Sequence, residues 1–243
     1  MRKFKSILRA VPAIIIATAL FSCGGSATKT AGDSTATGGS DTSKKNAMAA
    51  APAVPFDVVD VTHTIKDYAK WKPIFDADSV NRKAAGMQDL AVGREVDSTN
   101  KILVAFKLSD VAKAKSMAAD PKLMETMKKA GVISKPDFGY YHIIRFSGGP
   151  NSTQWVVVNH KVKDFDAWLK VFDNEGAAKR ESEGMVDRAL GRGIDDPNMV
   201  HIVFRVTDLA KAKAAIFSDD KKKLMMSAGV VGAPDIRFYN AGQ

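Results

Sequence analysis

The sequence holds few of the residues that metal and redox chemistry needs. Of its 243 residues only one is a cysteine, Cys23, and four are histidines. It contains no HxxxH or HExxH spacing, no GxGxxG turn, no P-loop and no nucleophile elbow. These absences exclude the common zinc, dinucleotide, nucleoside-triphosphate and serine-hydrolase sites, so we expect neither a metal nor a cofactor.

Positive charge is in excess but is not gathered in one place. The formal net charge is +9, yet the lysines alternate with acids in stretches such as KDYAKWK and DLAKAKA. A nucleic-acid-binding surface requires cations clustered on one face. We therefore expect solvated helix faces and no nucleic-acid partner.

The sequence has no apolar run long enough to be a typical membrane-spanning helix, and the apolar run near the N-terminus is short. Residues 10–21, AVPAIIIATALF, follow a basic start. A membrane-spanning helix needs about 20 apolar residues, so this run has the length of a signal peptide. It ends in LFSCGGS, which resembles the lipobox of bacterial lipoproteins. The resemblance implies a signal peptide over residues 1–22 and a membrane anchor through lipid on Cys23; a secretory signal with an incidental cysteine is the alternative.

The segment after the cysteine predicts a tether. Residues 23–55 are mostly Gly, Ser, Thr and Ala, a composition that buries too little surface to offset the entropy of ordering. We expect a lipid-anchored protein of the bacterial cell envelope, with its folded body in the periplasm or at the cell surface. The residues after Cys23, GGS, include no acid, which favours the outer membrane.

One phrase occurs twice in the remaining chain. HTIKDYAKWKPIF at 63–75 returns as HKVKDFDAWLKVF at 160–172, and the similarity continues through the strand and helix patterns that follow. The offset between the copies changes from 97 to 98 residues within or just after the first helix. Such a fixed long period indicates internal duplication, with one module over 56–150 and a second over 151–243.

Each copy predicts the element order βαββαβ. Alternating apolar residues indicate strands, and the pattern changes to helical spacing after Asp67 and Asp164, which we interpret as helix caps. Gly86 and Gly184 are placed to end these helices. This order is the ferredoxin-like split βαβ unit, whose apolar sheet face needs a cover.

The motifs, in order, resemble the dimeric α/β-barrel superfamily, which includes antibiotic-biosynthesis-monooxygenase-like domains. They are a strand ending in His, V-x-D-aromatic-x-x-W (with Ile65 in place of Val in the first copy), D-x-x-K-A-K and A-G-V-x-x-x-P-D, each present in both copies. The resemblance implies an α+β fold, with two tandem modules packed sheet to sheet as an intrachain barrel, and hence a monomer. The superfamily mixes oxygenases, cyclases, haem enzymes and proteins of unknown role, so it leaves the function open.

The repeated histidines are the main candidates for chemistry. His63 and His160 each share strand parity with two valines, which places them on an apolar face, either toward the barrel interior or under the helices. One interpretation is a general base or a ligand-binding donor. The other is a hydrogen bond to neighbouring backbone that stabilises the strand–helix junction.

Six further residues are candidates for ligand contact. Trp71 and Trp168 lie on the apolar stripe of the first helix of each copy, where core packing is the alternative explanation. Arginines near the helix ends and on the second strands could hold an anionic ligand, or complement helix C-termini. These are Arg82, Arg180, Arg94 and Arg192.

Three functions remain open. The first is a tethered module that binds a small, partly apolar ligand in a barrel cavity lined by His63 and His160. The second is a cofactor-independent monooxygenase or cyclase that uses these histidines as catalytic groups. The third is a non-catalytic interaction protein of the envelope. The other two histidines, His142 and His201, match Asn240 and Leu103 in the opposite copy.

Overall fold

The computed structural model describes residues 55–147 and 152–242. The predicted signal peptide, the predicted lipidation site Cys23 and the predicted linker up to residue 54 lie outside these residues. None of the described helices is both long and apolar enough to cross a membrane. The two predicted modules, by contrast, fall almost entirely within the described part.

The described residues form two successive βααββααβ units. The first consists of β1 (Phe56–Thr64), α1 (Tyr68–Ala77), α2 (Ser79–Ala84), β2 (Met87–Glu95), β3 (Lys101–Leu108), α3 (Val111–Ala118), α4 (Pro121–Lys129) and β4 (Asp137–Phe146). The second consists of β5 (Gln154–Val162), α5 (Phe165–Glu175), α6 (Ala177–Ser182), β6 (Met185–Gly193), β7 (Met199–Val206), α7 (Leu209–Ile216), α8 (Asp219–Ser227) and β8 (Val230–Ala241). The repeated order confirms the prediction of two ferredoxin-like modules, with each predicted helix divided in two.

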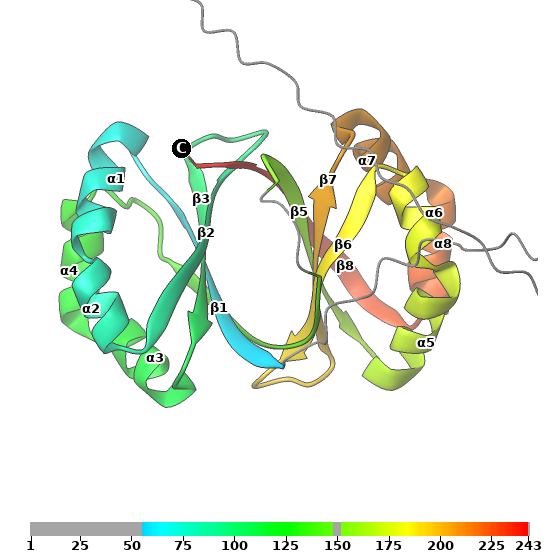
Figure 1. The fold of residues 1–243 in the computed structure, drawn as a ribbon, viewed down its shortest axis with the longest axis horizontal. Helices are drawn as coiled ribbons and strands as arrows, with labels where there is room; N and C mark the ends of the chain where they lie inside the picture. The colour runs from blue at the N-terminus through cyan, green and yellow to red at the C-terminus, as the bar shows by residue number, and fades with distance from the viewer. Residues whose placement is uncertain (1–54, 148–151, 243) are drawn as a thin grey trace, which may run out of the picture. The chain divides into compact units, whose positions relative to one another are not determined.

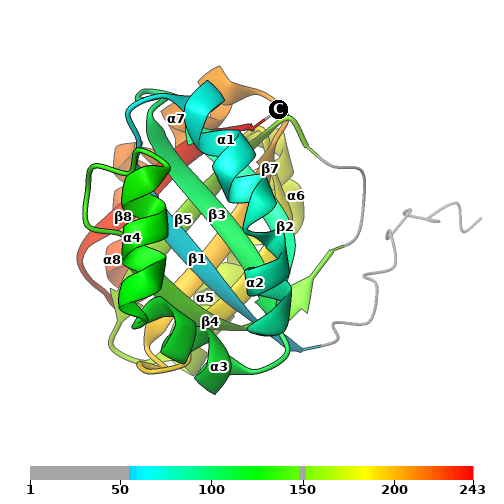
Figure 2. The same cartoon turned by 90° about the vertical axis from the view of Figure 1, so that its left-hand side faces the viewer.

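The strands close into one antiparallel barrel in the order β1-β3-β2-β8-β5-β7-β6-β4. Two seams join the halves, β2 with β8 and β4 with β6. Figure 1 shows the two halves facing each other with their helices outside, and Figure 2 shows α1–α4 covering the outer face of β1–β3. Because all neighbours are antiparallel, β1 and β5 begin at the same end of the barrel. The predicted intrachain α/β barrel is confirmed.

Short-range capping positions the helices as the sequence predicts. The carboxylates of Asp67 and Asp164 accept hydrogen bonds from the backbone three residues on, at 3.0 and 2.7 Å. Gly86 and Gly184 have φ values of 76° and 82°, a region that favours glycine. The one-residue change of offset arises because α5 has 11 residues and α1 has 10, while a single residue, Gly176 or Asp78, separates the two helices in each repeat.

Alternation along β1 separates two layers of the molecule. Val59 and Val61 face the helices and belong to the core of the first repeat. Val58 and Asp60 point to the other face and line the space inside the barrel. The barrel interior and the two helix layers are therefore three separate places in which a site could lie.

Candidate functional site

His63 and His160 face the helices and not the barrel interior. Their side chains are buried beside Trp71 and Trp168, with ring centres 5.7 and 5.5 Å apart. The expectation that they line the barrel cavity is wrong, because that cavity lies on the opposite face of the same strands. Whether they bind a ligand in the helix layer stays a prediction.

The backbone hydrogen bonds expected for these histidines are also not formed. Both ring nitrogens of His63 and of His160 are buried without a partner among the described residues. Burial lowers the pKa of each ring to about 4, so both are neutral at neutral pH. Each ring borders a small cavity between sheet and helices, of about 80 Å³ at His63 and about 60 Å³ at His160.

Trp71 and Trp168 lie in the cores of their repeats. They are 2% and 3% exposed and stack on Phe75 and Phe172 at 4.8 and 5.2 Å between ring centres. Their aromatic stripe joins the first helix to the sheet. Both also form part of the walls of the small cavities beside the histidines.

Arg82 and Arg180 are buried and bound to the protein itself. Arg82 donates to the Asp89 carboxylate at 3.1 and 2.9 Å, and its guanidinium lies 3.9 Å from the Phe75 ring centre. Arg180 repeats this arrangement with Asp187 at 2.7 and 2.6 Å. These bonds fasten α2 to β2 and α6 to β6, which gives both arginines a structural role.

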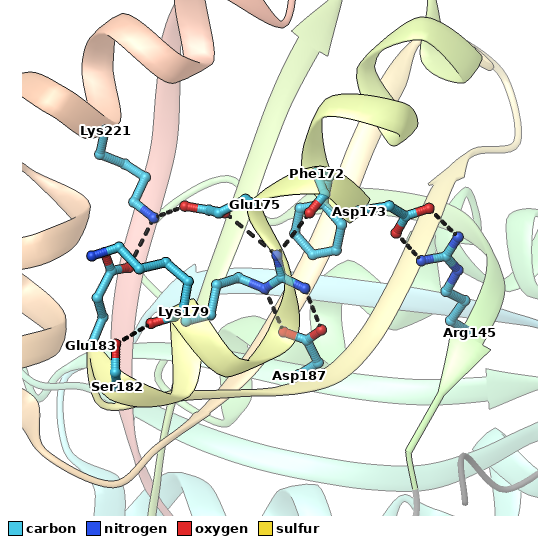
Figure 3. Close-up of polar contacts among 10 residues, drawn as sticks. Arg145, Phe172, Asp173, Glu175, Lys179, Ser182, Glu183, Asp187 and Lys221 are labelled. Atoms are coloured by element: carbon cyan, nitrogen blue, oxygen red, sulfur yellow. Dashed lines mark hydrogen bonds and ion pairs between the residues drawn. The ribbon is translucent and has the colours of Figure 1, made fainter. Parts of the chain in front are cut away.

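The helix layer of the second repeat holds a further charge network (Figure 3). Lys221 of α8 contacts the carboxylates of Glu175 and Glu183, the latter at 2.9 Å, and Glu175 also contacts Arg180 at 3.4 Å. The counterpart of Lys221 in the first repeat is Leu123, which borders the apolar cavity there. At this position the helix layer of the second repeat has ion pairs, whereas that of the first repeat has an apolar side chain.

Arg94 and Arg192 lie half-buried on β2 and β6, near the ends of these strands. Their Nε atoms donate to the carbonyls of Thr99 and Pro197, each at 3.0 Å. Arg192 also borders a shallow surface hollow beside His142. Neither arginine reaches the barrel cavity.

A cavity with apolar and polar walls lies inside the barrel. It is a cavity of about 300 Å³ at the end where β1 and β5 begin. Most of its wall is apolar, and the polar exceptions are few. They are Asp60, Ser152, Arg188, His201 and Arg205.

Asp60 and His201 form a buried polar pair at the inner end of this cavity. His201 Nδ1 donates to Asn159 Oδ1 at 2.8 Å, which leaves Nε2 as an acceptor 3.9 Å from Asp60 Oδ2. The His201 ring stacks on Tyr141 with centres 4.2 Å apart. No described residue gives the Asp60 carboxyl a hydrogen bond within normal range, although it is only 7% exposed.

Burial keeps both members of the pair close to their neutral forms. It raises the pKa of Asp60 to about 7 and lowers the pKa of His201 to about 3. A carboxyl group that titrates near neutrality can donate or accept a hydrogen bond within the cavity. The pair can therefore orient a polar group of a ligand or exchange a proton with it.

The twin of this cluster, in the other half of the barrel, is apolar. Asp60, His201 and Tyr141 correspond to Val157, Leu103 and Tyr239 at offsets of 97 and 98 residues. The latter three pack together in one buried cluster. The polar pair thus breaks the internal symmetry of the chain.

The sequence contained a signal for this pair that pattern matching missed. The candidate catalytic and ligand-binding residues predicted from the sequence all occur in both copies, whereas Asp60 and His201 differ from their counterparts Val157 and Leu103. Within residues 55–147 and 152–242, no group of three or more His, Cys, Asp or Glu side chains could hold a metal ion.

Comparison with known proteins identifies the fold. No protein-family model and no curated protein matches the sequence. Among solved structures, a putative monooxygenase from Fusobacterium nucleatum is 12% identical, with a TM-score of 0.53 over 79% of this chain and 94% of its own. An anthrone oxidase-like protein is also 12% identical, with a TM-score of 0.53 over 77% of this chain and 92% of its own. A ferredoxin-fold protein related to antibiotic biosynthesis monooxygenases, from Listeria monocytogenes, is 11% identical, with a TM-score of 0.47, over 79% of this chain and 97% of its own. The chain shares the fold of the Fusobacterium nucleatum and anthrone oxidase-like structures, which it builds from two ferredoxin-like units in tandem.

Proposed function

We propose that the barrel binds a small, partly apolar molecule in its interior, at the end where β1 and β5 begin. The observation that carries this proposal is the cavity of about 300 Å³ with the Asp60–His201 pair at its inner end. Its volume is at the lower limit of small-molecule pockets, which combine apolar walls with a few polar groups.

The chemistry of the pair supports binding over a purely structural role. A buried carboxyl group without a hydrogen bond is costly, and the apolar twin shows that the same strands fold without one. A ligand hydroxyl or carbonyl could supply the bond that Asp60 lacks. The apolar walls would gain about 25 cal/mol for each Å² that the ligand covers.

Binding can be tested by titrating the full-length chain with 1-decanol in a calorimeter. Ala105 lines the barrel cavity, so Ala105→Phe would fill it. Ala118 lines the small cavity beside His63, so Ala118→Phe is the matched control in the helix layer. Decanol should bind to the wild type and to Ala118→Phe, and binding should be lost in Ala105→Phe with the circular dichroism spectrum unchanged. Loss in Ala118→Phe alone, or no binding to the wild type, would overturn the proposal.

A second candidate is an enzyme that moves a proton in the first helix layer. His63 favours it, because its neutral ring has no partner among the described residues and borders a cavity. The smaller volume of that cavity, about 80 Å³, places this function second. It is tested by oxygen uptake with anthrone, for which the balanced reaction is anthrone plus O₂ to anthraquinone plus water. Uptake that His63→Asn abolishes and His160→Asn preserves would support this candidate; no uptake by the wild type would exclude anthrone as its substrate.

We also propose that lipid on Cys23 tethers the protein to a bacterial membrane. The support is the LFSCGGS sequence after a short apolar run. The test is metabolic labelling with palmitate, followed by membrane fractionation of the wild type and Cys23→Ser. Label and membrane association should both depend on Cys23; unlabelled protein in the membrane fraction would contradict the lipid anchor.

A further inference from the structure

We infer, on the basis of the proposed barrel site, that its ligand is an amphipathic monocarboxylate whose carboxylate binds between Arg188 and Arg205. The ligand's apolar body then extends along the barrel, and a hydroxyl or carbonyl at its far end would meet Asp60 and His201, as the proposed function requires. Four structural features carry this inference: the position of the two arginines, their lack of acidic partners, their absence from the twin half, and the spacing along β7.

Both arginines lie at the outer end of the cavity and belong to adjacent strands. Arg205 is next to last in β7 and pairs with Trp155 near the start of β5. Arg188 is the extra residue of a bulge in β6, where the register shifts between Asp187 and Ala189. Each side chain is half-buried and lines the cavity.

Neither guanidinium forms an ion pair within the part of the chain that the structure describes. Arg205 Nε is buried without a hydrogen-bond partner. Arg188 donates to the backbone carbonyl of Ser147 and lies 4.3 Å from the ring centre of Phe146. Burial, followed by the charge of Arg205, lowers the pKa of Arg188. The two guanidinium groups repel each other in a site that is partly shielded from water. One bound anion would reduce this repulsion.

The twin half has no second anion site. The counterpart of Arg188 is Leu90, which also occupies a strand bulge. The counterpart of Arg205 is Lys107, whose ammonium lies 5.0 Å from the centre of the Phe56 ring and does not line the cavity. The positive charge therefore lies only in the second repeat, at the outer end of the cavity. A ligand with one anionic group would bind there in a single orientation.

Strand geometry sets the size of the ligand. Arg205 lies four positions beyond His201 on β7. At about 3.3 Å per residue the two side chains are about 13 Å apart along the strand. The wall between them is apolar and includes Val203 and its partner on β6, Ala189. An extended chain of about ten carbons spans this distance, with its carboxylate in the planar forks of the arginines.

The test is calorimetric titration of the full-length chain with four probes of equal chain length: decanoate, 1-decanol, decyl sulfate and decylamine. Decanoate should bind about tenfold or more tightly than decanol, in line with charge-assisted hydrogen bonds. Arg205→Gln and Arg188→Leu should each weaken decanoate about tenfold and leave decanol unchanged. Leucine is compatible with the bulge, because Leu90 occupies the equivalent position.

Lys107→Gln is the matched control, since it removes one positive charge from the equivalent strand position outside the cavity. It should leave decanoate binding unchanged. Equal affinity for decanoate and decanol would overturn the inference and leave the barrel proposal intact. A preference for decanoate that neither arginine variant reduces, or tighter binding of decyl sulfate, would also overturn the carboxylate assignment. Failure of decanol to bind to the wild type would overturn the barrel site itself.

Discussion

Each half of the barrel has a tyrosine at the same position, but the residues that contact it differ between the halves. Tyr141 stacks on His201, which faces Asp60, whereas Tyr239 packs against Leu103 and Val157. The order of strands and helices and the bulges of β2 and β6 are repeated in the two halves. The fold therefore does not depend on the polar pair, and the pair requires an explanation other than folding. Binding in the adjacent cavity supplies one.

Placing a charge in the apolar half should have the largest effect. Val157→Asp puts a carboxyl group among Leu103 and Tyr239 without the histidine that Asp60 faces. We expect the free energy of unfolding to fall by about 3 kcal/mol, the cost of a buried and unpaired polar group. Urea unfolding followed by circular dichroism measures it. A loss of less than about 0.5 kcal/mol would show that the apolar half tolerates charge.

The helix layers offer a second contrast, between Lys221 and Leu123. Lys221→Leu reproduces the residue of the first repeat but leaves Glu175 and Glu183 without their shared ammonium. The free energy of unfolding should fall by about 2 kcal/mol, because both carboxylates are largely buried. Lys222→Leu, on the same helix, is the control; its side chain is 63% exposed, so its loss should change stability by about 0.5 kcal/mol or less. Equal losses in the two variants would refute the network's role.

Making the polar half resemble its twin should stabilise the protein. Asp60→Val with His201→Leu replaces a buried polar pair by the residues of the other half, which we expect to raise the free energy of unfolding by about 1–2 kcal/mol. The matched control is Asp57→Val with His142→Leu, a half-exposed pair 2.7 Å apart. The control should change stability little. A destabilised Asp60/His201 double variant would indicate that the pair serves folding after all.

The smallest effect concerns the pH dependence of the free energy of unfolding, which should differ between Asp60→Val and His201→Leu. The pKa of Asp60 is raised from 3.8 to about 7, so the folded state holds a proton that the unfolded state releases, and stability falls as pH rises through this range. The pKa of His201 is lowered from 6.5 to about 3, so stability falls on acidification below 6.5. From about pH 7 to about pH 4.5, Asp60→Val should lose more stability than the wild type and His201→Leu less, each on the order of 1 kcal/mol. Urea unfolding of the wild type and both variants at the two pH values measures these changes. A smaller loss than the wild type in Asp60→Val, or a larger loss in His201→Leu, would contradict the prediction.

Architecture followed from the sequence because it rests on short-range patterns that occur twice. The caps at Asp67 and Asp164 and the glycines at 86 and 184 lie where they were predicted. The site did not follow, for two reasons. Strand parity alone cannot say which face of the sheet meets the helices, so it leaves open whether His63 and His160 face the barrel interior or the helix layer. Asp60 and His201 also come from strands of different repeats, and only the closed barrel brings them together.

The central claim is that the barrel interior, and not the helix layer, binds the ligand. Adjacent valines on one strand distinguish these two places, since Val58 lines the barrel cavity and Val59 lines the cavity beside His63. The most direct measurement is a methyl NMR titration of the full-length chain with decanoate. The account predicts that the methyl signals of Val58 and Val157 shift while those of Val59 and Val156 stay in place. Shifts of Val59 with Val58 unchanged would contradict it.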